Sequence, residues 1–359
     1  MMNSKERVLA VYNDEKRSLL DKVPSHVQYI APEFISRYED YFINRYNHTH
    51  FNEYFGAPYS LGFDSVFAPI PSSVKFKRME ITTEKGEQVR IGIDGQSVVS
   101  KTEYYEGGYV ISLEILNQMR EQLTIVDKTK EIKAVLEGYK RIESHIYAIV
   151  MINGIFDRAW QAMGMTEFSK HFRKKTELYR EVIQFYADIL ISNVEALINA
   201  SDAQERVVTI LDDVAYKGRP MISPAQWEHD FFPYYRDVNK KLSEAGMISQ
   251  LHTDGDPTDL ISIFQRAGFQ GLQGWEGGAD PFLINERYHD FVVLGFGDVS
   301  HILPFGTQSQ ICAHVEELML ALKENRHFII GPSTIIYERI PLQNVKIFMD
   351  AISQYGRYY

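Results

Sequence analysis

The chain has 359 residues, of which 45% are hydrophobic and 24% charged, and Cys312 is its one cysteine. These fractions are typical of a globular protein and exclude a disordered chain. A single cysteine cannot form an internal disulfide or a thiolate-rich metal site, and it fits a reducing, cytoplasmic compartment best. The net charge is −10 without any dense basic run, so no nucleic acid partner is expected. No stretch of ~18 consecutive apolar residues occurs, so no membrane partner is expected either.

The N-terminal third predicts a helix, two short strands and an insertion. Residues 3–20 carry an apolar stripe behind a capping Asn3 or Ser4, which predicts a helix. Short β-type runs follow at 23–31 and 59–69. Residues 74–112 then alternate apolar and polar side chains, with turn signals such as Lys85-Gly86 and Asp94-Gly95, which predicts an inserted β-meander.

From residue 113 onward, short apolar runs alternate with helical stretches. The runs are 146–154, 206–213, 247–254, 268–276, 291–298 and 327–333. The helices between them are near 156–200, 224–245, 256–267, 308–325 and 342–355. With the two earlier runs this makes eight strands, and strand–helix alternation implies a parallel sheet. We therefore predict an α/β fold, a (β/α)8 TIM barrel, as a single domain over 1–359 with a helical segment at 1–22 and the β-meander at 74–112.

Active groups of such a barrel gather at the carboxyl ends of its strands. The last residues of the runs are Asp64, Asn153, Asp212, Asp213, His252, Asp254, Glu276, Asp298 and Ser333. Any of them can instead cap the next helix, and capping is the preferred interpretation for Ser223 and for Asp256 or Thr258. His252 and Asp254 are two residues apart on a strand, so both side chains face the same side. Two roles for His252 and Asp254 are given equal weight: a functional pair in the site and a structural hydrogen bond.

Aromatic residues are abundant, with 22 Tyr, 21 Phe and 3 Trp. Core packing is the commoner role of such side chains. The functional alternative is that some of them form the walls of a ligand pocket at the barrel mouth, where neighbouring glycines leave room. The candidates are Tyr216, Trp275, Phe296, Phe305 and Tyr337.

Several segments resemble the uroporphyrinogen decarboxylase-like superfamily and, within it, the corrinoid (cobalamin)-dependent methyltransferases. They are KERVLAVYNDEKRSLLDKVP (5–24), LDDVAYKGRPMISPAQWEHDFFPYYRDV (211–238), LHTDGDPTDLISIFQRAGFQGLQGWEGGAD (251–280), GFGDVSHILPFGT (295–307) and IPLQNVKIFMDAISQYG (340–356). Together they follow the order of that family over nearly the whole chain. The family fold is a (β/α)8 barrel, in agreement with the strand count.

Two departures from the family pattern restrict the function. The decarboxylase carries an Arg-Gln-Ala-Gly-Arg segment, but this chain has QYIAPEF (28–34), with no arginine to pair a tetracarboxylate substrate. The thiol-methylating members bind zinc through His-x-Cys and a later cysteine. Here those positions are His252-Thr253-Asp254 and Ser333, and Cys312 lies in a predicted helix. A thiolate zinc site that ionises a substrate thiol is therefore not built.

The resemblance implies an O-demethylase of the methyltransferase I type. Such an enzyme moves a methyl group from a methoxylated, aromatic substrate (a methyl ether) to cob(I)alamin on a partner corrinoid-binding protein. The departing oxygen needs a proton or a Lewis acid. We expect His252 and Asp254, with Glu276 and Asp213 nearby, to supply the proton. A zinc ion on His252, Asp254 and Glu276 is the metal-assisted version.

The remaining expectations concern substrate, partners and alternatives. The residues expected to bind the substrate are Tyr216, Trp275, Phe296, Asp298, Ser333 and Tyr337, with the aromatic ones sandwiching its ring. The β-meander would contact the corrinoid protein or, in a homodimer, the second subunit. The alternatives are a lyase of the decarboxylase type, a thiol or amine methyltransferase of the same superfamily, and a non-catalytic binding module.

Overall fold

The computed structural model describes residues 2–46, 52–82, 86, 88–93, 95–98, 105–202 and 205–358. The chain forms two compact units. The barrel unit comprises Met1–Pro69, Val135–Met151 and Ala203–Tyr359, and the inserted unit comprises Ile70–Ala134 and Ile152–Asp202. Compactness alone does not show that a unit folds independently, so the single domain over 1–359 stays a prediction.

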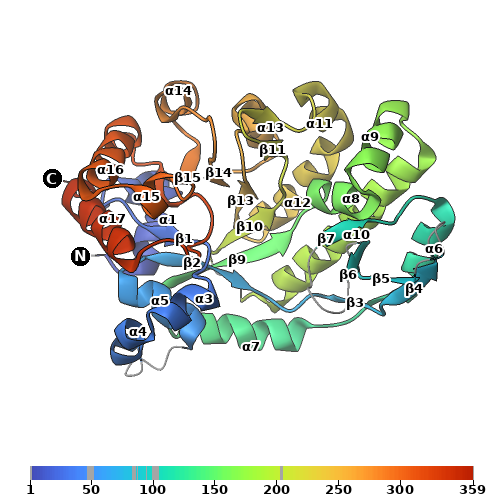
Figure 1. Cartoon of the computed structure of the whole chain (residues 1–359), viewed down its shortest axis with the longest axis horizontal. Coiled ribbons are helices and arrows are strands. Elements are labelled where there is room, and N and C mark those ends of the chain that lie inside the picture. Colours follow the sequence, from blue (N-terminus) through green and yellow to red (C-terminus); the bar gives the residue numbers. More distant parts are fainter. Residues whose placement is uncertain are drawn as a thin grey trace. The chain divides into compact units, whose positions relative to one another are not determined.

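Eight parallel strands form the core of the barrel unit (Figure 1). In their order around the sheet they are β1 (His26–Val27), β2 (Ser65–Pro69), β9 (Tyr147–Asn153), β10 (Val207–Leu211), β13 (Ile248–Thr253), β14 (Gly271–Gly274), β15 (Val292–Gly297) and β16 (Phe328–Pro332). The last strand returns to the first, because parallel bridges join Ser25 to Ile330 and Ile30 to Ile336. The predicted α/β fold, a (β/α)8 TIM barrel, is confirmed.

Helices of the barrel unit precede and follow these strands. They are α1 (Ser4–Val11), α2 (Asp14–Arg17), α3 (Pro32–Arg37), α4 (Glu39–Tyr46), α5 (Glu53–Leu61), α11 (Pro224–Asp230), α12 (Phe232–Glu244), the 3-10 turn η1 (Thr258–Leu260), α13 (Ile261–Arg266), α14 (Pro281–Arg287), α15 (Ile302–Phe305), α16 (Gln308–Leu322) and α17 (Leu342–Tyr355). The predicted helix 224–245 is two helices because Pro233 lacks an N–H group and starts a new first turn. Ser223 caps α11, as predicted, by accepting a hydrogen bond from Gln226 N.

The N-terminal predictions need two corrections. Residues 3–20 are not one helix: Asn13 has an extended backbone, and its side chain caps α2 by accepting from Glu15 N and Lys16 N. The run 59–69 is a strand only in its second half, because α5 continues to Leu61 and ends at Gly62, whose φ is 91°. Asp64 therefore precedes β2, and the prediction that it ends a strand at the barrel mouth is wrong.

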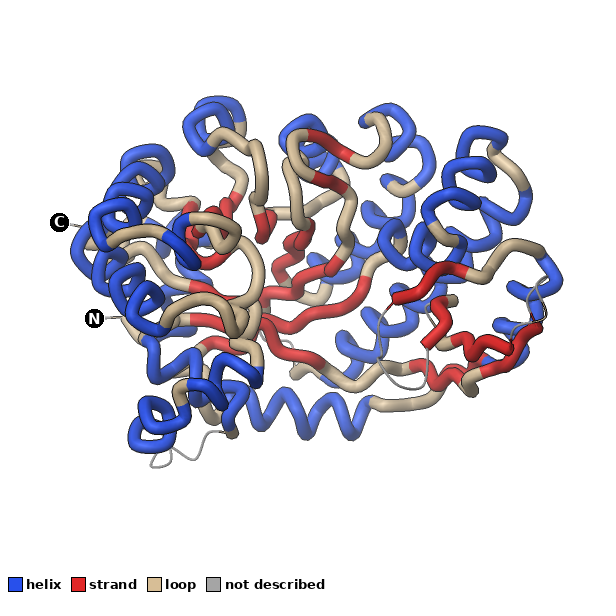
Figure 2. The backbone as a smooth tube through the Cα atoms, in the orientation of Figure 1, coloured by secondary structure: helices blue, strands red, loops and turns tan. Residues whose placement is uncertain are grey.

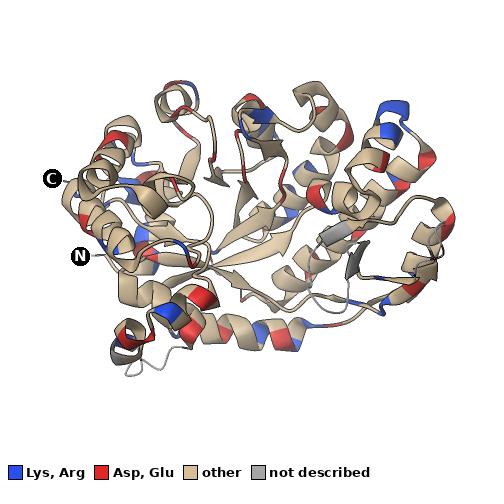
Figure 3. Ribbon diagram, in the orientation of Figure 1, with Lys and Arg blue, Asp and Glu red and all other residues tan. Residues whose placement is uncertain are grey.

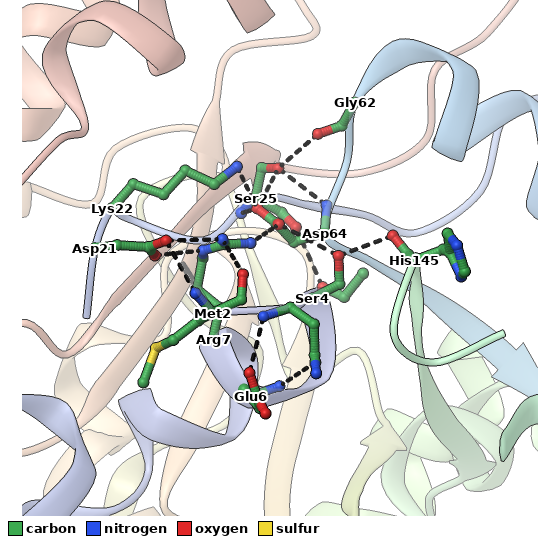
Figure 4. A network of polar contacts seen from close by, with 12 residues as sticks. Met2, Ser4, Glu6, Arg7, Asp21, Lys22, Ser25, Gly62, Asp64 and His145 are labelled. Carbon is green, nitrogen blue, oxygen red and sulfur yellow. Dashed lines mark hydrogen bonds and ion pairs between the residues drawn. The ribbon is translucent and has the colours of Figure 1, made fainter. Parts of the chain in front are cut away.

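Asp64 instead holds a network at the amino end of the barrel (Figure 4). Arg7 donates to Asp64 Oδ1 at 2.5 Å and to Asp21 Oδ1 at 2.8 Å. Lys22 Nζ lies 3.1 Å from Asp64 Oδ2, and Ser25 N donates to the same oxygen at 2.9 Å. The apolar residues of α1 pack into the interior against residues of the strands, including Phe67 and Leu294. The helix α1 thus closes this end of the barrel.

The inserted unit holds the β-meander predicted at 74–112 as far as those residues are described (Figure 2). Its strands β4 (Met79–Thr82), β5 (Gln88–Ile91), β6 (Gln96–Val98) and β7 (Tyr105–Gly108) form an antiparallel sheet, whereas β3 (Val74–Phe76) pairs with β8 (Leu123–Ile125). Lys85 and Asp94 of the predicted turns lie outside the described residues.

The helical stretch predicted at 156–200 also belongs to the inserted unit, from α8 to α10. It is three helices, α8 (Phe156–Met163), α9 (Met165–Lys174) and α10 (Glu177–Ala200), separated by the positive φ of Gly164 and Lys175. The helix α6 (Leu113–Gln122) lies in this unit, and α7 (Thr129–Lys140) leads from it back to the barrel unit.

Acidic and basic side chains are mixed on the helices, as along α7 (Figure 3). Among the described helices, none is both long enough and apolar enough to cross a membrane.

Candidate functional site

Five neighbouring strands of the barrel unit deliver the candidate residues to its carboxyl end. Asp213 follows β10, and His252 lies near the end of β13 with Asp254 directly after it. The register places Leu211 opposite His252 and His252 opposite Gln273 of β14. Trp275 and Glu276 follow β14, Phe296 is near the end of β15 with Asp298 after it, and Ser333 follows β16. Parallel pairing therefore gathers these residues at one edge.

An imidazole and two carboxylates meet at the centre of this edge. His252 Nε2 lies 3.8 Å from Asp213 Oδ1 and 3.9 Å from Asp254 Oδ1. Asp254 N donates to Asp213 Oδ1 at 2.9 Å, which fixes the two loops against each other. One ligand atom from each of the three residues lies within 4.8 Å of the others, close enough for the three to hold one metal ion. Glu276, predicted as the third metal ligand, is not part of this group; Asp213 is.

The Asp254 carboxyl group is held in an unusual state. Burial raises its pKa, the neighbouring His252 opposes that rise, and the charges of Asp213 and Glu276 add to it, so that the pKa is about 6. Its Oδ1 is buried without a hydrogen-bond partner. A carboxyl group in this state can hold a proton near neutral pH, which an ordinary aspartate cannot.

Two glutamines that the sequence analysis missed hold the other side of His252. Gln273 Oε1 lies 2.5 Å from His252 Nδ1, and Gln28 Nε2 donates to Gln273 Oε1 at 3.1 Å. Gln273 Nε2 donates to the backbone oxygen of Ser333 at 2.9 Å. The available signal was a glutamine directly after β1 (Gln28) and one within the apolar strand β14 (Gln273), but only the tertiary structure shows that they meet His252.

A cavity of about 620 Å³ opens beside this cluster, a volume suited to a small organic molecule. Its walls include seven of the predicted residues: Tyr216, Asp254, Trp275, Glu276, Phe296, Asp298 and Ser333. They also include residues that the sequence analysis missed, among them Lys217, Ser300, His301 and His314. Lys217 lies in the turn of a small hairpin formed by β11 (Ala215–Tyr216) and β12 (Arg219–Pro220). Nothing in the pattern around these residues separates them from ordinary loop and helix residues.

Trp275 and Phe296 form one aromatic wall of the cavity. Their rings are stacked with centroids 5.3 Å apart and planes 7° from parallel, so no third ring fits between them. These two residues therefore offer one outer face to a substrate ring, and the sandwich predicted for Tyr216, Trp275, Phe296 and Tyr337 stays a prediction. Both have positive φ, 73° and 69°, which costs of order 1 kcal/mol each for a non-glycine residue.

The glycine before each aromatic residue explains this geometry. Gly274 and Gly295 face each other across β14 and β15. A Cβ on Gly274 would lie 2.0 Å from Thr253 O, and one on Gly295 would lie 2.6 Å from Gly274 O. Only glycine permits the three strands to approach this closely, and the backbone then turns both rings toward the mouth.

The other predicted residues lie around the cluster or away from it. Glu276 Oε1 accepts a hydrogen bond from Ser333 Oγ at 3.0 Å. Tyr337 donates to Val299 O at 2.9 Å and is not one of the residues lining the cavity. Asp212 is buried and accepts a hydrogen bond from the Tyr235 hydroxyl, so it faces away from the mouth. Phe305 is 76% exposed and does not line the cavity either.

An eight-stranded parallel barrel with a polar cluster at its carboxyl end places the protein in the class of (β/α)8-barrel proteins. Within that class the chain belongs to the uroporphyrinogen decarboxylase family, since the family model described as Uroporphyrinogen decarboxylase (URO-D) matches residues 101–355. A comparison with curated protein sequences finds no match.

Several solved structures are similar to this chain. A methyltransferase from Methanosarcina mazei is 18% identical in sequence, with 99% of each chain covered and a TM-score of 0.64. The pneumococcal virulence factor StrH is 11% identical over 94% of this chain and 84% of that chain, with a TM-score of 0.43. The ribulose-1,5-bisphosphate carboxylase/oxygenase of Pyrococcus horikoshii is 9% identical over 96% and 62%, with a TM-score of 0.39.

Proposed function

We propose that the protein is a methyltransferase that takes a methyl group from a methoxylated aromatic substrate and passes it to cob(I)alamin on a partner corrinoid-binding protein. The observation that carries the proposal is the cluster of His252, Asp213 and Asp254 beside a cavity with an aromatic wall. The full-length structural similarity to a protein named a methyltransferase supports it. The corrinoid supplies the nucleophile, so the chain itself must bind the donor and assist the leaving group.

The polar cluster must stabilise the oxygen that leaves when the methyl group is transferred. When the methyl–oxygen bond breaks, the methyl group goes to the nucleophile and the bonding pair stays on the oxygen, which needs a proton. With a pKa of about 6, roughly a tenth of Asp254 is protonated at pH 7. Asp254 and the adjacent His252 can deliver this proton while the Trp275–Phe296 wall holds the ring. Both the acid and the aromatic wall border the same cavity.

A metal-assisted version fits the same residues. One imidazole nitrogen and two carboxylates are zinc ligands, and three protein ligands leave a fourth position for substrate oxygen. Zinc bonds of about 2.1 Å require tetrahedral ligand atoms to be roughly 3.4 Å apart. The observed 3.8 and 3.9 Å lie within about half an ångström of that spacing. A zinc ion held by His252, Asp213 and Asp254 would act on the departing oxygen as a Lewis acid.

The alternatives receive less support from the cavity. A decarboxylase-type lyase needs cationic groups for substrate carboxylates, and among the described lining residues the permanent cation is Lys217, alongside three acidic residues. A thiol methyltransferase needs thiolate ligands, and Cys312 lies on α16, outside the lining of the described cavity.

The test is incubation with cob(I)alamin and a panel of methoxyaromatics, methylamines and methanol, followed by the absorbance of the methylated corrinoid. We expect turnover with methoxyaromatics and a loss of ~100-fold or more in His252→Ala and in Asp254→Ala. Asp256→Asn is the control, because its Oδ1 only accepts hydrogen bonds from Thr258 and asparagine keeps that acceptor. Treatment with a chelator separates the versions: activity lost and restored by zinc supports the metal, and unchanged activity supports acid catalysis. No product from any donor, or near-normal rates in both alanine variants, would refute the proposal.

A further inference from the structure

The hydrogen bonds around His252 decide which of its ring nitrogens carries a proton. Gln273 is fully buried, so each of its amide atoms needs a partner. The Ser333 backbone oxygen, 2.9 Å away, can only accept, so the nitrogen of the Gln273 amide must face it. The amide oxygen then faces His252 Nδ1 at 2.5 Å, and this contact is a hydrogen bond only if Nδ1 carries the proton.

Gln28 follows the orientation of the Gln273 amide. Its Nε2 donates to Gln273 Oε1 at 3.1 Å and lies 3.4 Å from His252 Nδ1. If the Gln28 amide were reversed, its oxygen would face Gln273 Oε1 at about 3.1 Å, and two oxygens cannot hydrogen-bond each other. Gln273 Oε1 therefore accepts from two donors, Gln28 Nε2 and His252 Nδ1, and neither amide can turn over without losing its bonds.

We infer that Gln273 is a positioning residue that fixes the tautomer of His252, with the proton on Nδ1 and with Nε2 turned toward Asp213 and Asp254. The lone pair of Nε2, facing two carboxylates, takes up a proton or a cation. This tautomer is therefore the one needed in both versions of the proposed function. In one, His252 helps to deliver a proton to the departing oxygen; in the other, it binds a metal ion together with Asp213 and Asp254. The use made of Nε2 rests on the proposed function; the tautomer itself does not.

The chain offers matched variants for a test. Gln273→Met removes the acceptor at similar volume, and Gln273→Glu keeps an oxygen acceptor for Nδ1. Gln250→Met is the control, because Gln250 is equally buried, lies two residues before His252 on β13, and bonds Thr209 and Tyr12 instead. Gln273→Leu, which also removes the acceptor, serves as the second variant if Gln273→Met does not fold.

The readout is the set of side-chain nitrogen resonances of ¹⁵N-histidine-labelled protein at a pH of about 8, above the ordinary pKa of histidine. The His252 signal is assigned by its loss in His252→Gln. We expect a protonated Nδ1 in the parent protein, in Gln250→Met and in Gln273→Glu. In Gln273→Met, or in Gln273→Leu as its substitute, we expect a mixture of tautomers. Methyl transfer should fall ~10- to 100-fold in Gln273→Met and recover in part in Gln273→Glu.

A parent protein with the proton on Nε2, or an unchanged tautomer in Gln273→Met, would overturn the inference. This failure is distinguishable from failure of the proposed function. If the tautomer responds as expected but no donor on the panel is demethylated, the tautomer assignment holds and the methyl-transfer proposal falls.

Discussion

Replacing Asp254 by asparagine should stabilise the protein at high pH while removing its activity. The carboxyl group has a pKa of about 6, against an ordinary value of 3.8, so ionisation is less favourable in the folded state than in the unfolded chain. For an acid with a raised folded-state pKa, the cost is absent below about pH 4, grows between about pH 4 and 6, and is complete above pH 6. Asparagine cannot ionise, so it avoids this cost.

The size of the effect follows from the shift of about two pKa units. At 1.36 kcal/mol per unit the full cost is about 3 kcal/mol. The Asp254 side chain is 41% exposed although its Oδ1 is buried, so solvent screens part of the charge and about 1–2 kcal/mol remains. For a chain of this length that corresponds to a rise in Tm of about 1–3 °C.

Thermal unfolding followed by circular dichroism measures this difference, with a chelator present so that no bound cation holds the carboxylate. We expect Tm of Asp254→Asn to exceed that of the parent at pH 8 and to match it closely at pH 4. Asp256→Asn, on the same loop but outside the cluster, reports effects common to the loop. An equal change of Tm at both pH values, or a lower Tm at pH 8, would refute the reasoning.

Two further predictions concern the framework of the barrel. Gly274→Ala should destabilise the protein by roughly 2–4 kcal/mol and impair methyl transfer, because the new Cβ meets Thr253 O at 2.0 Å at a φ of 132°. Gly138→Ala, on α7 with no atom within 4 Å of the new Cβ, should instead stabilise by about 0.5–1 kcal/mol, and similar Tm values for both variants would contradict this. Arg7→Met should lower stability by about 3 kcal/mol, since Asp64, only 4% exposed, loses one of its cations. Its activity per folded molecule should stay unchanged because the network lies at the amino end, and adding Asp64→Asn should restore part of the Tm.

Local pattern sufficed for the architecture of the C-terminal two thirds of the chain. Alternation between short apolar runs and amphipathic stretches follows from the different side-chain periods of strands and helices, which neighbouring residues alone determine. The predicted helix at 342–355 has the same bounds as α17, and Asp213, Asp254, Glu276 and Asp298 do follow strands. The prediction failed for Asp64, because Gly62 ends a helix where the run 59–69 resembled one strand.

The pairing of residues within the site was outside the reach of the sequence. That His252 and Asp254 share a side follows from their spacing along one strand. That Asp213 rather than Glu276 completes the group, that Gln273 bonds His252 Nδ1, and that Gln28 bonds Gln273 depend on register across β10, β13 and β14 and on loop conformation. The stacking of Trp275 on Phe296 likewise depends on two strained backbone positions on separate strands. The sequence by itself determined the barrel and the polar residues at its carboxyl end. Only the tertiary structure decided which of these polar residues come together, because their contacts join positions that are distant in the chain.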